Sequence, residues 1–314
     1  MKDYNIIIIL GPTAYGNTKL AALLAHKLGS EIISADSRQV YRDMNIGTGK
    51  DYADYIVEAE SLKYHLIDIA DAGSDYHIHQ YMQDFAKALQ LISQKNKIPI
   101  LCGGTGLYID AVLSAYQFSS VPINAVLRDE LKNKSKEELK NIFDELAATS
   151  YTSLADTSTK KRLIRAIEIT SYLENNKHES MNMPALKPVL IGLLPDRNLR
   201  RKNIEERLQY RLQNGLLEET RSLLKIGVTE ERLSLYGLEY KFTLMHLKNL
   251  HSYQDLQSQL CTAIQQFAKR QMTFFRGMER KGWNIHWIDA SLPLDEQLNQ
   301  TLKIVNRIPI AIGT

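Results

Sequence analysis

The sequence predicts an α/β fold in which helices flank a parallel β-sheet. Three apolar segments, at residues 6–10, 98–102 and 189–194, have the length and composition of buried parallel strands. A glycine-rich turn and then a helical pattern follow each of the first two segments. This order of strand, glycine turn and helix is the setting in which phosphate-binding loops occur, so we expect ligands at the carboxyl ends of the strands.

The first glycine-rich turn has the spacing of a phosphate-binding loop. In G-x-x-x-x-G-K-[ST] loops, backbone N–H groups at a helix N-terminus bind phosphate oxygens, and a lysine adds charge. Gly11, Gly16 and Thr18 fit this spacing, but Asn17 stands where the lysine is expected. A neutral hydrogen bond is about half as strong as a charge-assisted one. Lys19 lies about 200° further around the helix and is a poor substitute. A tight turn that binds no phosphate stays open as an alternative.

Composition indicates a cytoplasmic protein. The 314 residues include 39 Lys and Arg against 36 Asp and Glu, a net charge of +3 that permits nucleic-acid binding without requiring it. The two cysteines, Cys102 and Cys261, lie in apolar contexts without metal-ligand spacing, so we expect buried free thiols in a reducing compartment. We expect no signal peptide, because the apolar run near the N-terminus is too short, and no segment reaches transmembrane length.

Two domains are predicted from a change in character along the chain. Residues 1–118 and 189–314 read as the α/β core with C-terminal helices, whereas 119–188 reads as a small helical insertion domain. The insertion contains a charged helical segment from 132, a polar loop at 150–159, a helix from 160 and a loop at 175–188. For the rest of the chain we expect these elements: helices at 19–28, 78–94, 204–215, 216–226, 256–276 and 293–305, and strands at 31–35 and 283–289.

Polar side chains follow two further predicted strands. Asp36 comes directly after the strand at 31–35, and Thr105 lies in the second glycine-rich turn, Gly103–Tyr108. Because the carboxyl ends of parallel strands meet at one edge of a sheet, both should face the same crevice as the first loop. The alternatives for Asp36 are that it caps a helix or lies in the outer coordination shell of Mg²⁺. His65 is more simply a structural hydrogen-bonding residue than a catalyst.

Basic residues interleaved with aromatic residues recur in the last third of the chain. Arginine with aromatics suits contacts with a phosphate backbone and stacking on bases, but a solvated helix face explains the pattern equally well. The set comprises Arg200, Arg201, Lys202, Arg207, Arg211, Lys269, Arg270, Arg276 and Lys281, with Tyr210, Phe274, Phe275 and Trp283.

Eight segments together resemble the tRNA dimethylallyltransferase (isopentenyl-tRNA transferase) family. They occur in the family's order and span about residues 5–289, and the segment from Ile32 to Arg42 is the most diagnostic. The segments are Gly11–Ala14, Ile32–Arg42, Ile46–Lys50, His65–Asp68, Gly103–Tyr108, Arg162–Glu168, Gly215–Glu219 and Lys269–Thr273.

The resemblance implies transfer of a dimethylallyl group from its diphosphate to N6 of the adenosine 3′ of the anticodon in tRNA. It implies that Asp36 takes the N6 proton, with Thr18 and Thr105 as further catalytic residues, and that Thr18 binds Mg²⁺. The target base would be flipped into a channel, the insertion would grip the anticodon stem, and we expect a monomer. Implied diphosphate-binding residues are Gly11, Thr13, Gly16, Asn17, Thr18 and Thr105, and implied tRNA-binding residues are Arg38, Gln39, Arg162, Arg165, Arg207, Arg270 and Gln271.

The departures from the family pattern cluster at the donor site. A small residue and a lysine are usual where Tyr15 and Asn17 stand, and an arginine is expected where Asn203 stands. A catalytically weakened or inactive paralogue that still binds tRNA is therefore the alternative hypothesis. The first 50 residues alone would also suit a small-molecule or nucleotide kinase, but phosphoryl transfer depends on the missing lysine.

Overall fold

The chain forms two compact units, which we describe separately. The computed structural model describes residues 4–114, 118, 121–176, 184–194 and 196–307. One unit comprises Met1–Leu113 and Ala185–Thr314, and the other Ser114–Pro184. The second unit occupies nearly the same segment that the change in composition singles out. Part of the loop predicted at 175–188, residues 177–183, lies outside the described residues.

A six-stranded parallel sheet forms the centre of the first unit. Its strand order is β5-β2-β6-β1-β7-β8. Neighbouring strands pair in parallel throughout, with Leu10 opposite Gly103 and Ser34 opposite Cys102. The strands are β1 (Ile6–Leu10), β2 (Ile32–Ser34), β5 (Tyr64–His65), β6 (Ile100–Gly103), β7 (Pro188–Leu194) and β8 (Ile285–Asp289). A separate hairpin pairs β3 (Ile56–Val57) with β4 (Glu60–Ser61).

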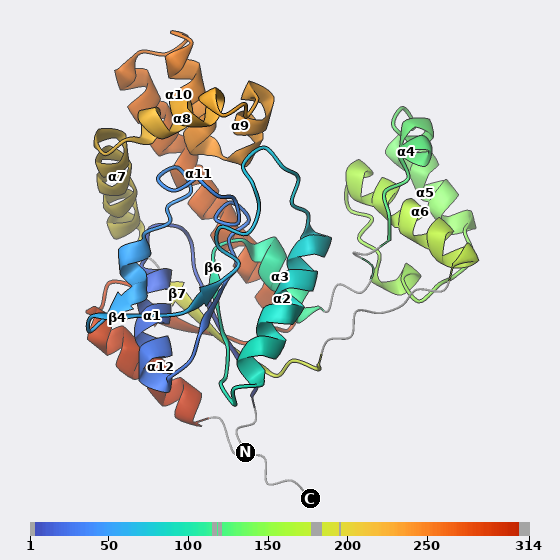
Figure 1. Cartoon of the computed structure of the whole chain (residues 1–314). Coiled ribbons are helices and arrows are strands. Elements are labelled where there is room, and N and C mark those ends of the chain that lie inside the picture. The colour runs from blue at the N-terminus through green and yellow to red at the C-terminus, as the bar shows by residue number, and fades with distance from the viewer. Residues whose placement is uncertain (1–3, 115–117, 119–120, 177–183, 195, 308–314) are drawn as a thin grey trace, which may run out of the picture. The chain divides into compact units, whose positions relative to one another are not determined.

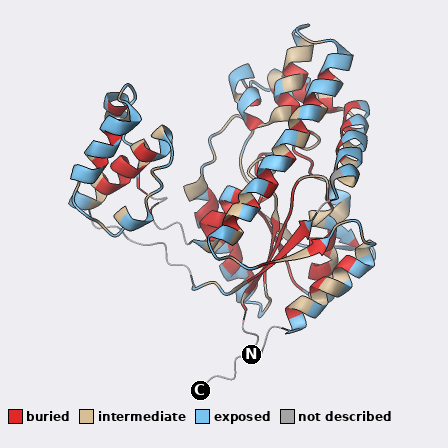
Figure 2. Cartoon of the chain, turned by 180° about the vertical axis from the view of Figure 1, so that it is seen from behind, coloured by how far each residue is buried: buried red, intermediate tan, exposed pale blue. Residues whose placement is uncertain are grey.

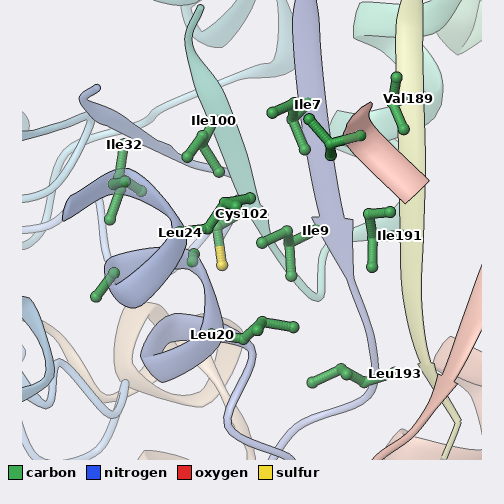
Figure 3. Close-up of a cluster of buried hydrophobic side chains, with 14 of the residues drawn as sticks. Ile7, Ile9, Leu20, Leu24, Ile32, Ile100, Cys102, Val189, Ile191 and Leu193 are labelled. Atoms are coloured by element: carbon green, nitrogen blue, oxygen red, sulfur yellow. The ribbon is translucent and has the colours of Figure 1, made fainter. Parts of the chain in front are cut away.

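Helices cover both faces of this sheet, which explains why its strands are apolar on both sides (Figures 1 and 2). In β1 all five residues are buried. Ile7 and Ile9 join a cluster with Leu20 of α1 (Asn17–Leu28) and Val305 of α12 (Leu294–Arg307), much of which is drawn in Figure 3. The opposite face is covered by α2 (Ile78–Ser93) and α3 (Gly106–Leu113), with the later part of α11 (Tyr253–Arg280) beside α3.

The remaining helices of this unit gather beyond one end of the sheet (Figure 1). They are α7 (Arg197–Gln213), α8 (Leu216–Lys225), α9 (Glu230–Tyr236) and α10 (Leu238–Leu247), with the early part of α11. Leucine and isoleucine side chains of α7, such as Ile204 and Leu208, pack on Leu256 and Leu260 of α11. This packing orients α7 so that its other residues approach the carboxyl end of the sheet.

The second unit is a small helical domain with its own core. It contains α4 (Ala125–Leu131), α5 (Lys136–Glu145), a 3-10 turn at Thr152–Leu154 and α6 (Lys160–Asn175). Leu139 and Phe143 of α5 pack against Leu163 and Ile167 of α6. The buried carboxylate of Glu168 accepts hydrogen bonds from Arg128, Arg165 and the backbone N–H of Asn124, and so joins α6 to the start of α4.

Most predicted elements are present, and the differences have local causes. The charged segment at 132 does not begin a helix, because α5 starts at Lys136 behind its cap Ser135. The helix predicted from Ile204 starts earlier, at Arg197, because the Asp196 side chain caps it by accepting from the N–H groups of Asn198 and Leu199. Neither α9 nor α10 was predicted from the sequence.

The cysteines differ from each other. Cys102 is buried, and burial raises the pKa of its thiol to about 12, whereas Cys261 is only half-buried, contrary to the expectation for both. No helix in the described ranges is long and apolar enough to span a membrane.

Glu31, just before β2, is a buried charge with three basic neighbours. Its carboxylate lies 2.6 Å from Lys95 Nζ, 3.5 Å from Lys97 Nζ and 2.8 Å from His65 Nε2, in the structural role expected for that histidine. Burial opposes ionisation of Glu31, but the hydrogen bonds from Lys95 and His65 and the lysine charges outweigh it and lower its pKa to about 2. This network secures the strand that leads to Asp36.

We predict that Glu31→Gln reduces the free energy of unfolding by about 2–3 kcal/mol at pH 7. The folded-state pKa lies below the unfolded value of about 4.3, so the stabilisation is present above that value and is lost as the pH falls toward about 2. Urea unfolding across this pH range should therefore show a steeper loss for the wild type than for the variant. In the control, Glu231→Gln at an exposed position should change stability by no more than about 0.5 kcal/mol. If the free energy of unfolding depends on pH in the same way for the wild type and Glu31→Gln, ionised Glu31 does not stabilise the fold.

Candidate active site

The phosphate-type loop runs from the end of β1 to the start of α1. Ala14 and Gly16 have positive φ angles of 70° and 78°. Gly16 precedes α1 and its carbonyl accepts the N–H of Leu20 at 3.0 Å, so the left-handed conformation that glycine permits is what turns the loop into the helix. Thr18 lies in the first turn of α1 and is half-buried.

Asn17 directs its amide back into the loop. Its Nδ2 donates to the carbonyls of Gly11 at 3.0 Å and Pro12 at 3.3 Å. Its Oδ1 is buried and has no hydrogen-bond partner among the described residues. The side chain at the lysine position therefore closes the loop on itself and brings no charge to it.

The loop is also tied to α7 through neutral groups. Asn203 Nδ2 donates to the carbonyl of Ala14 at 3.2 Å, and the Tyr15 hydroxyl donates to the carbonyl of Asp196 at 3.2 Å. The Tyr15 ring is buried in the main hydrophobic cluster, and burial raises its pKa above the ordinary value. Its bulk is thus largely accommodated by the core.

A single side chain of α11 joins the two glycine-rich turns. Gln271 is 8% exposed; its Oε1 accepts the N–H of Thr13 at 3.0 Å, and its Nε2 donates to the carbonyl of Gly104 at 2.8 Å. Both ends of its amide are therefore used within the protein. The link holds the loop after β1 and the loop after β6 side by side.

Asp36 follows β2 and is oriented by its own turn. Its Oδ1 accepts the N–H of Arg38 at 2.9 Å. The hydroxyl oxygen of Thr105 accepts the N–H of Ser37 at 3.1 Å, so the second glycine turn supports the segment that carries the carboxylate. The Asp36 side chain remains 20% exposed and faces the cleft described below.

A chain of charges extends from Asp36 toward α7. Arg38 Nε lies 3.8 Å from Asp36 Oδ1, and Arg38 Nη1 lies 3.4 Å from Glu239 Oε2. Glu239 Oε1 in turn lies 3.5 Å from Arg211 Nη1. The Arg38 guanidinium also lies over the Phe267 ring, 5.1 Å from its centroid. The buried carboxylate of Glu239 thus holds an arginine from each side of the site.

Arg207 connects α7 to the loop and to residues 49–51. Its Nη1 donates to the Thr13 hydroxyl at 3.3 Å, and its Nη2 lies 2.8 Å from Asp51 Oδ2. Lys19 instead pairs at 3.9 Å with Asp54, which agrees with the expectation that it is a poor substitute for the loop lysine.

The Ile46–Lys50 segment is anchored by a carboxylate from α8. Glu219 accepts the consecutive backbone N–H groups of Asn45, Ile46 and Gly47 at 2.7–2.9 Å, and the hydroxyl of Tyr240 at 2.7 Å. These contacts hold the segment so that Gly49 faces α7.

These elements surround one cleft of about 690 Å³. Asp36 and the phosphate-type loop lie on its walls, as the sequence predicts for side chains at the carboxyl ends of parallel strands. Predicted site residues that line it are Thr13, Gly16, Asn17, Thr18, Asp36, Arg38, Gln39, Arg207 and Gln271.

Five predicted site residues are not among the residues that line this described cleft. Gly11 and Thr105 belong to the two turns, and Arg270 is exposed on α11. Arg162 and Arg165 lie on α6 of the second unit, where Arg162 contacts Asp156 at 2.6 Å and Arg165 donates to the Val121 carbonyl at 2.7 Å. Their proposed contacts with diphosphate or tRNA stay predictions.

Glu239 and Glu219 were not predicted as site residues, and Arg211 was predicted only as a member of the basic and aromatic set. Glu219 lies inside a family-like segment, and Arg211 follows Arg207 by one helical turn, so each had a signal. Glu239 had none, because its partners Arg38 and Arg211 are distant in sequence.

The fold and the cleft together define an α/β protein of the phosphate-loop type, with a carboxylate beside the loop. Residues 39–278 match the model of the IPP transferase family. The chain is 48% identical to tRNA dimethylallyltransferase 1 of Parabacteroides distasonis, over 98% of this chain and 99% of that protein. It is 50% identical to tRNA dimethylallyltransferase 2 of Bacteroides fragilis, over 95% of this chain and 97% of that protein.

Solved structures agree with this likeness. The full-length tRNA isopentenylpyrophosphate transferase of Bacillus halodurans has a TM-score of 0.70 and 27% identity, with 96% of this chain and 97% of that chain covered. A eukaryotic dimethylallyltransferase acting on tRNA has a TM-score of 0.74 at 20% identity, over 98% of this chain and 80% of that chain, which shows the fold alone. The chain belongs to the IPP transferase family.

We predict that Glu219→Gln lowers the free energy of unfolding by about 1–3 kcal/mol, because an amide cannot accept all four hydrogen bonds at its two ends. Amide hydrogen exchange at Asn45, Ile46 and Gly47 should accelerate together. The adjacent Glu218→Gln is the control; Glu218 forms an exposed pair with Arg221 at 3.2 Å, so the change should stay within about 0.5 kcal/mol. Equal effects of the two variants would show that Glu219 does not anchor this segment.

Proposed function

We propose that this protein transfers a dimethylallyl group from dimethylallyl diphosphate to N6 of the adenosine 3′ of the anticodon in tRNA. Two relatives named tRNA dimethylallyltransferase, at 48% and 50% identity over nearly the whole chain, support the reaction. The observation that carries the proposal is structural. Asp36 and the phosphate-type loop line one cleft, so a carboxylate that can accept a proton lies beside a loop that can bind a diphosphate.

The reaction forms a bond between N6 of adenosine and C1 of the dimethylallyl group. The bond from C1 to the diphosphate oxygen breaks, and inorganic diphosphate leaves with the electron pair. The exocyclic amine is barely basic because its lone pair is delocalised into the ring, so a carboxylate that accepts its proton as the new bond forms assists the attack. The proton passes from N6 to an Asp36 oxygen.

Asp36 is well positioned for this role. The backbone N–H of Arg38 binds Oδ1 at 2.9 Å and fixes the rotamer of the carboxylate. Thr105 supports the same turn through the N–H of Ser37. We therefore propose that Thr105 positions the Asp36 carboxylate, in addition to the diphosphate contact that the family resemblance implies.

The diphosphate would bind the first loop at the N-terminus of α1. Backbone N–H groups there and the helix dipole favour negative charge. Mg²⁺ is commonly bound by one or two protein groups together with substrate phosphates. The described ranges contain no group of three or more His, Cys, Asp or Glu that could hold a metal ion by themselves. We therefore propose that Mg²⁺ binds together with the diphosphate. Thr18 would hold the ion, which neutralises the charge that develops on the leaving group. Implied loop contacts are Gly11, Thr13, Gly16 and Asn17.

The tRNA anticodon stem-loop is the proposed acceptor. Arg38, Gln39 and Gln271 line the cleft that the target base would enter, and Arg207 lies beside them. Arg270 is exposed on α11 and suits a phosphate contact. Arg162 and Arg165 lie on α6 of the second unit, which we propose grips the stem. We also propose that the protein is a monomer, and that it is cytoplasmic because two free cysteines suit a reducing compartment.

A paralogue that binds tRNA but transfers the prenyl group weakly or not at all is the second candidate. The contacts of Asn17 favour it, because this side chain donates to two loop carbonyls and carries no charge. Such a protein would show salt-sensitive tRNA binding and little affinity for the donor.

We predict that Asp36→Asn lowers the rate of prenylation at least ~100-fold, because an asparagine cannot accept the N6 proton. The assay incubates protein, Mg²⁺, dimethylallyl diphosphate and unmodified tRNA, and detects N6-dimethylallyladenosine by mass spectrometry after nuclease digestion. Asp43→Asn is the control, because Asp43 is exposed and has a positive φ of 62°, a conformation that asparagine adopts readily.

If the wild-type protein binds tRNA in a filter assay but yields no product at high enzyme concentration, the proposed transferase activity is wrong and the second candidate, a paralogue that only binds tRNA, is supported. Equal rates for Asp36→Asn and Asp43→Asn would instead remove Asp36 from the chemistry.

A further inference from the structure

Two guanidinium groups from successive turns of α7 meet at Gly49. Gly49 has a φ of 71°, and a Cβ built there would overlap the Nη2 atoms of both Arg207 and Arg211. Only glycine permits this approach. The backbone at Gly49 thus leaves room for the two like-charged groups, which lie side by side on the wall of the cleft.

Arg211 is the cation with an uncommitted donor. Arg211 is 8% exposed and lines the cleft, and its Nη1 contacts Glu239 Oε1 at 3.5 Å. Its Nη2 is buried and has no hydrogen-bond partner among the described residues. Burial and the charge of Arg207 lower the pKa of Arg211 to about 10, so the group remains charged at neutral pH and is poorly compensated.

The other cations on the described cleft wall are already paired. Lys19 contacts Asp54 at 3.9 Å. Arg38 contacts Asp36 and Glu239, and Arg207 contacts Asp51. An incoming anion therefore shares any of these three cations with a carboxylate, whereas Nη2 of Arg211 has no hydrogen-bond partner among the described residues.

The phosphate-type loop itself is lined by neutral amides. Asn17 Nδ2 donates to Gly11 and Pro12, and Asn203 Nδ2 donates to Ala14. Each amide satisfies a loop carbonyl and neither brings charge. Arg207, which donates to the Thr13 hydroxyl at 3.3 Å, links the loop to the arginine pair.

We propose that Arg211 binds the diphosphate of the prenyl donor, beside Arg207, and supplies the positive charge that position 17 lacks. This inference rests on the proposed function for the identity of the donor, but the anion site itself is defined by the contacts of Arg211. A purely structural role, in which Arg211 only neutralises Glu239, is the competing explanation.

The test measures binding of inorganic pyrophosphate with Mg²⁺ by isothermal titration calorimetry, with the full chain and no tRNA. We expect Arg211→Gln to weaken binding at least ~10-fold, because a charge-assisted bond is replaced by a neutral one. The control is Arg201→Gln, on the exposed face of the same helix, which should bind as the wild type does. Adding Asn17→Lys to Arg211→Gln should recover affinity to within ~3-fold of wild type, because it restores one charge to the loop.

A second pair of variants separates anion binding from structural pairing. Glu239→Gln removes the partner and keeps Arg211, so pyrophosphate affinity should be equal to or tighter than wild type. The double variant Arg211→Gln/Glu239→Gln removes both charges and leaves no unpaired carboxylate, and it should bind at least ~10-fold more weakly than Glu239→Gln. Circular dichroism checks the fold of each variant.

Equal pyrophosphate affinity for Arg211→Gln and Arg201→Gln would overturn the proposal, as would equal affinity for Glu239→Gln and the double variant. The outcome is independent of the transferase assay. Tight, Arg211-dependent pyrophosphate binding without prenyl transfer would contradict the proposed function and support the anion site at Arg211. Prenyl transfer with Arg211-independent pyrophosphate binding would support the proposed function and contradict the anion site at Arg211.

Discussion

The pairing of β1, β6 and β2 is the constraint on which the site depends. β6 lies between the other two strands, with Leu10 opposite Gly103 and Ser34 opposite Cys102. In a parallel sheet this register places the residues that follow all three strands at one edge. The phosphate-type loop, Asp36 and the second glycine turn are therefore neighbours before any side-chain contact is made. Gln271 and Thr105 then secure the loops to one another through hydrogen bonds.

In the cleft, the positive charge near the phosphate-type loop lies on α7 and not on the loop itself. Asparagines at positions 17 and 203 bond loop carbonyls, while the nearby positive charges come from Arg207 and Arg211 on α7. The buried carboxylate of Glu239 links Arg211 to Arg38, and Arg38 in turn lies beside Asp36. Because charges interact strongly where water is excluded, Arg211 on α7 and Arg38 beside Asp36 are coupled through one glutamate.

Much of the fold was predictable because it follows from local patterns. The apolar runs of β1, β6 and β7, the glycine turns and the insertion are visible along the chain, and Asp36 stands out as a polar residue after a strand. The starts of α5 and α7 were misjudged, because the caps Ser135 and Asp196 decide where each helix begins. Arg162 and Arg165 lie on the helix that the sequence predicts in the insertion, but helical spacing does not say what they contact, which is Asp156 and the Val121 carbonyl.

The sequence by itself determined the α/β class, the loop with its missing lysine, and the family resemblance. Each of these depends on short segments whose residues are close together in the chain. Only the tertiary structure decided that Asn17 bonds its own loop, that Gln271 joins two turns, and that Nη2 of the cleft residue Arg211 has no hydrogen-bond partner in the part of the chain that the structure describes. The contacts of Gln271 and Arg211 depend on how α7, α10 and α11 pack on one another and at the sheet edge, and Gln271 and Gly104 are 167 residues apart in the chain. Spacing along a chain predicts which chemistry is available, but packing decides which groups are already satisfied and which remain to bind a substrate.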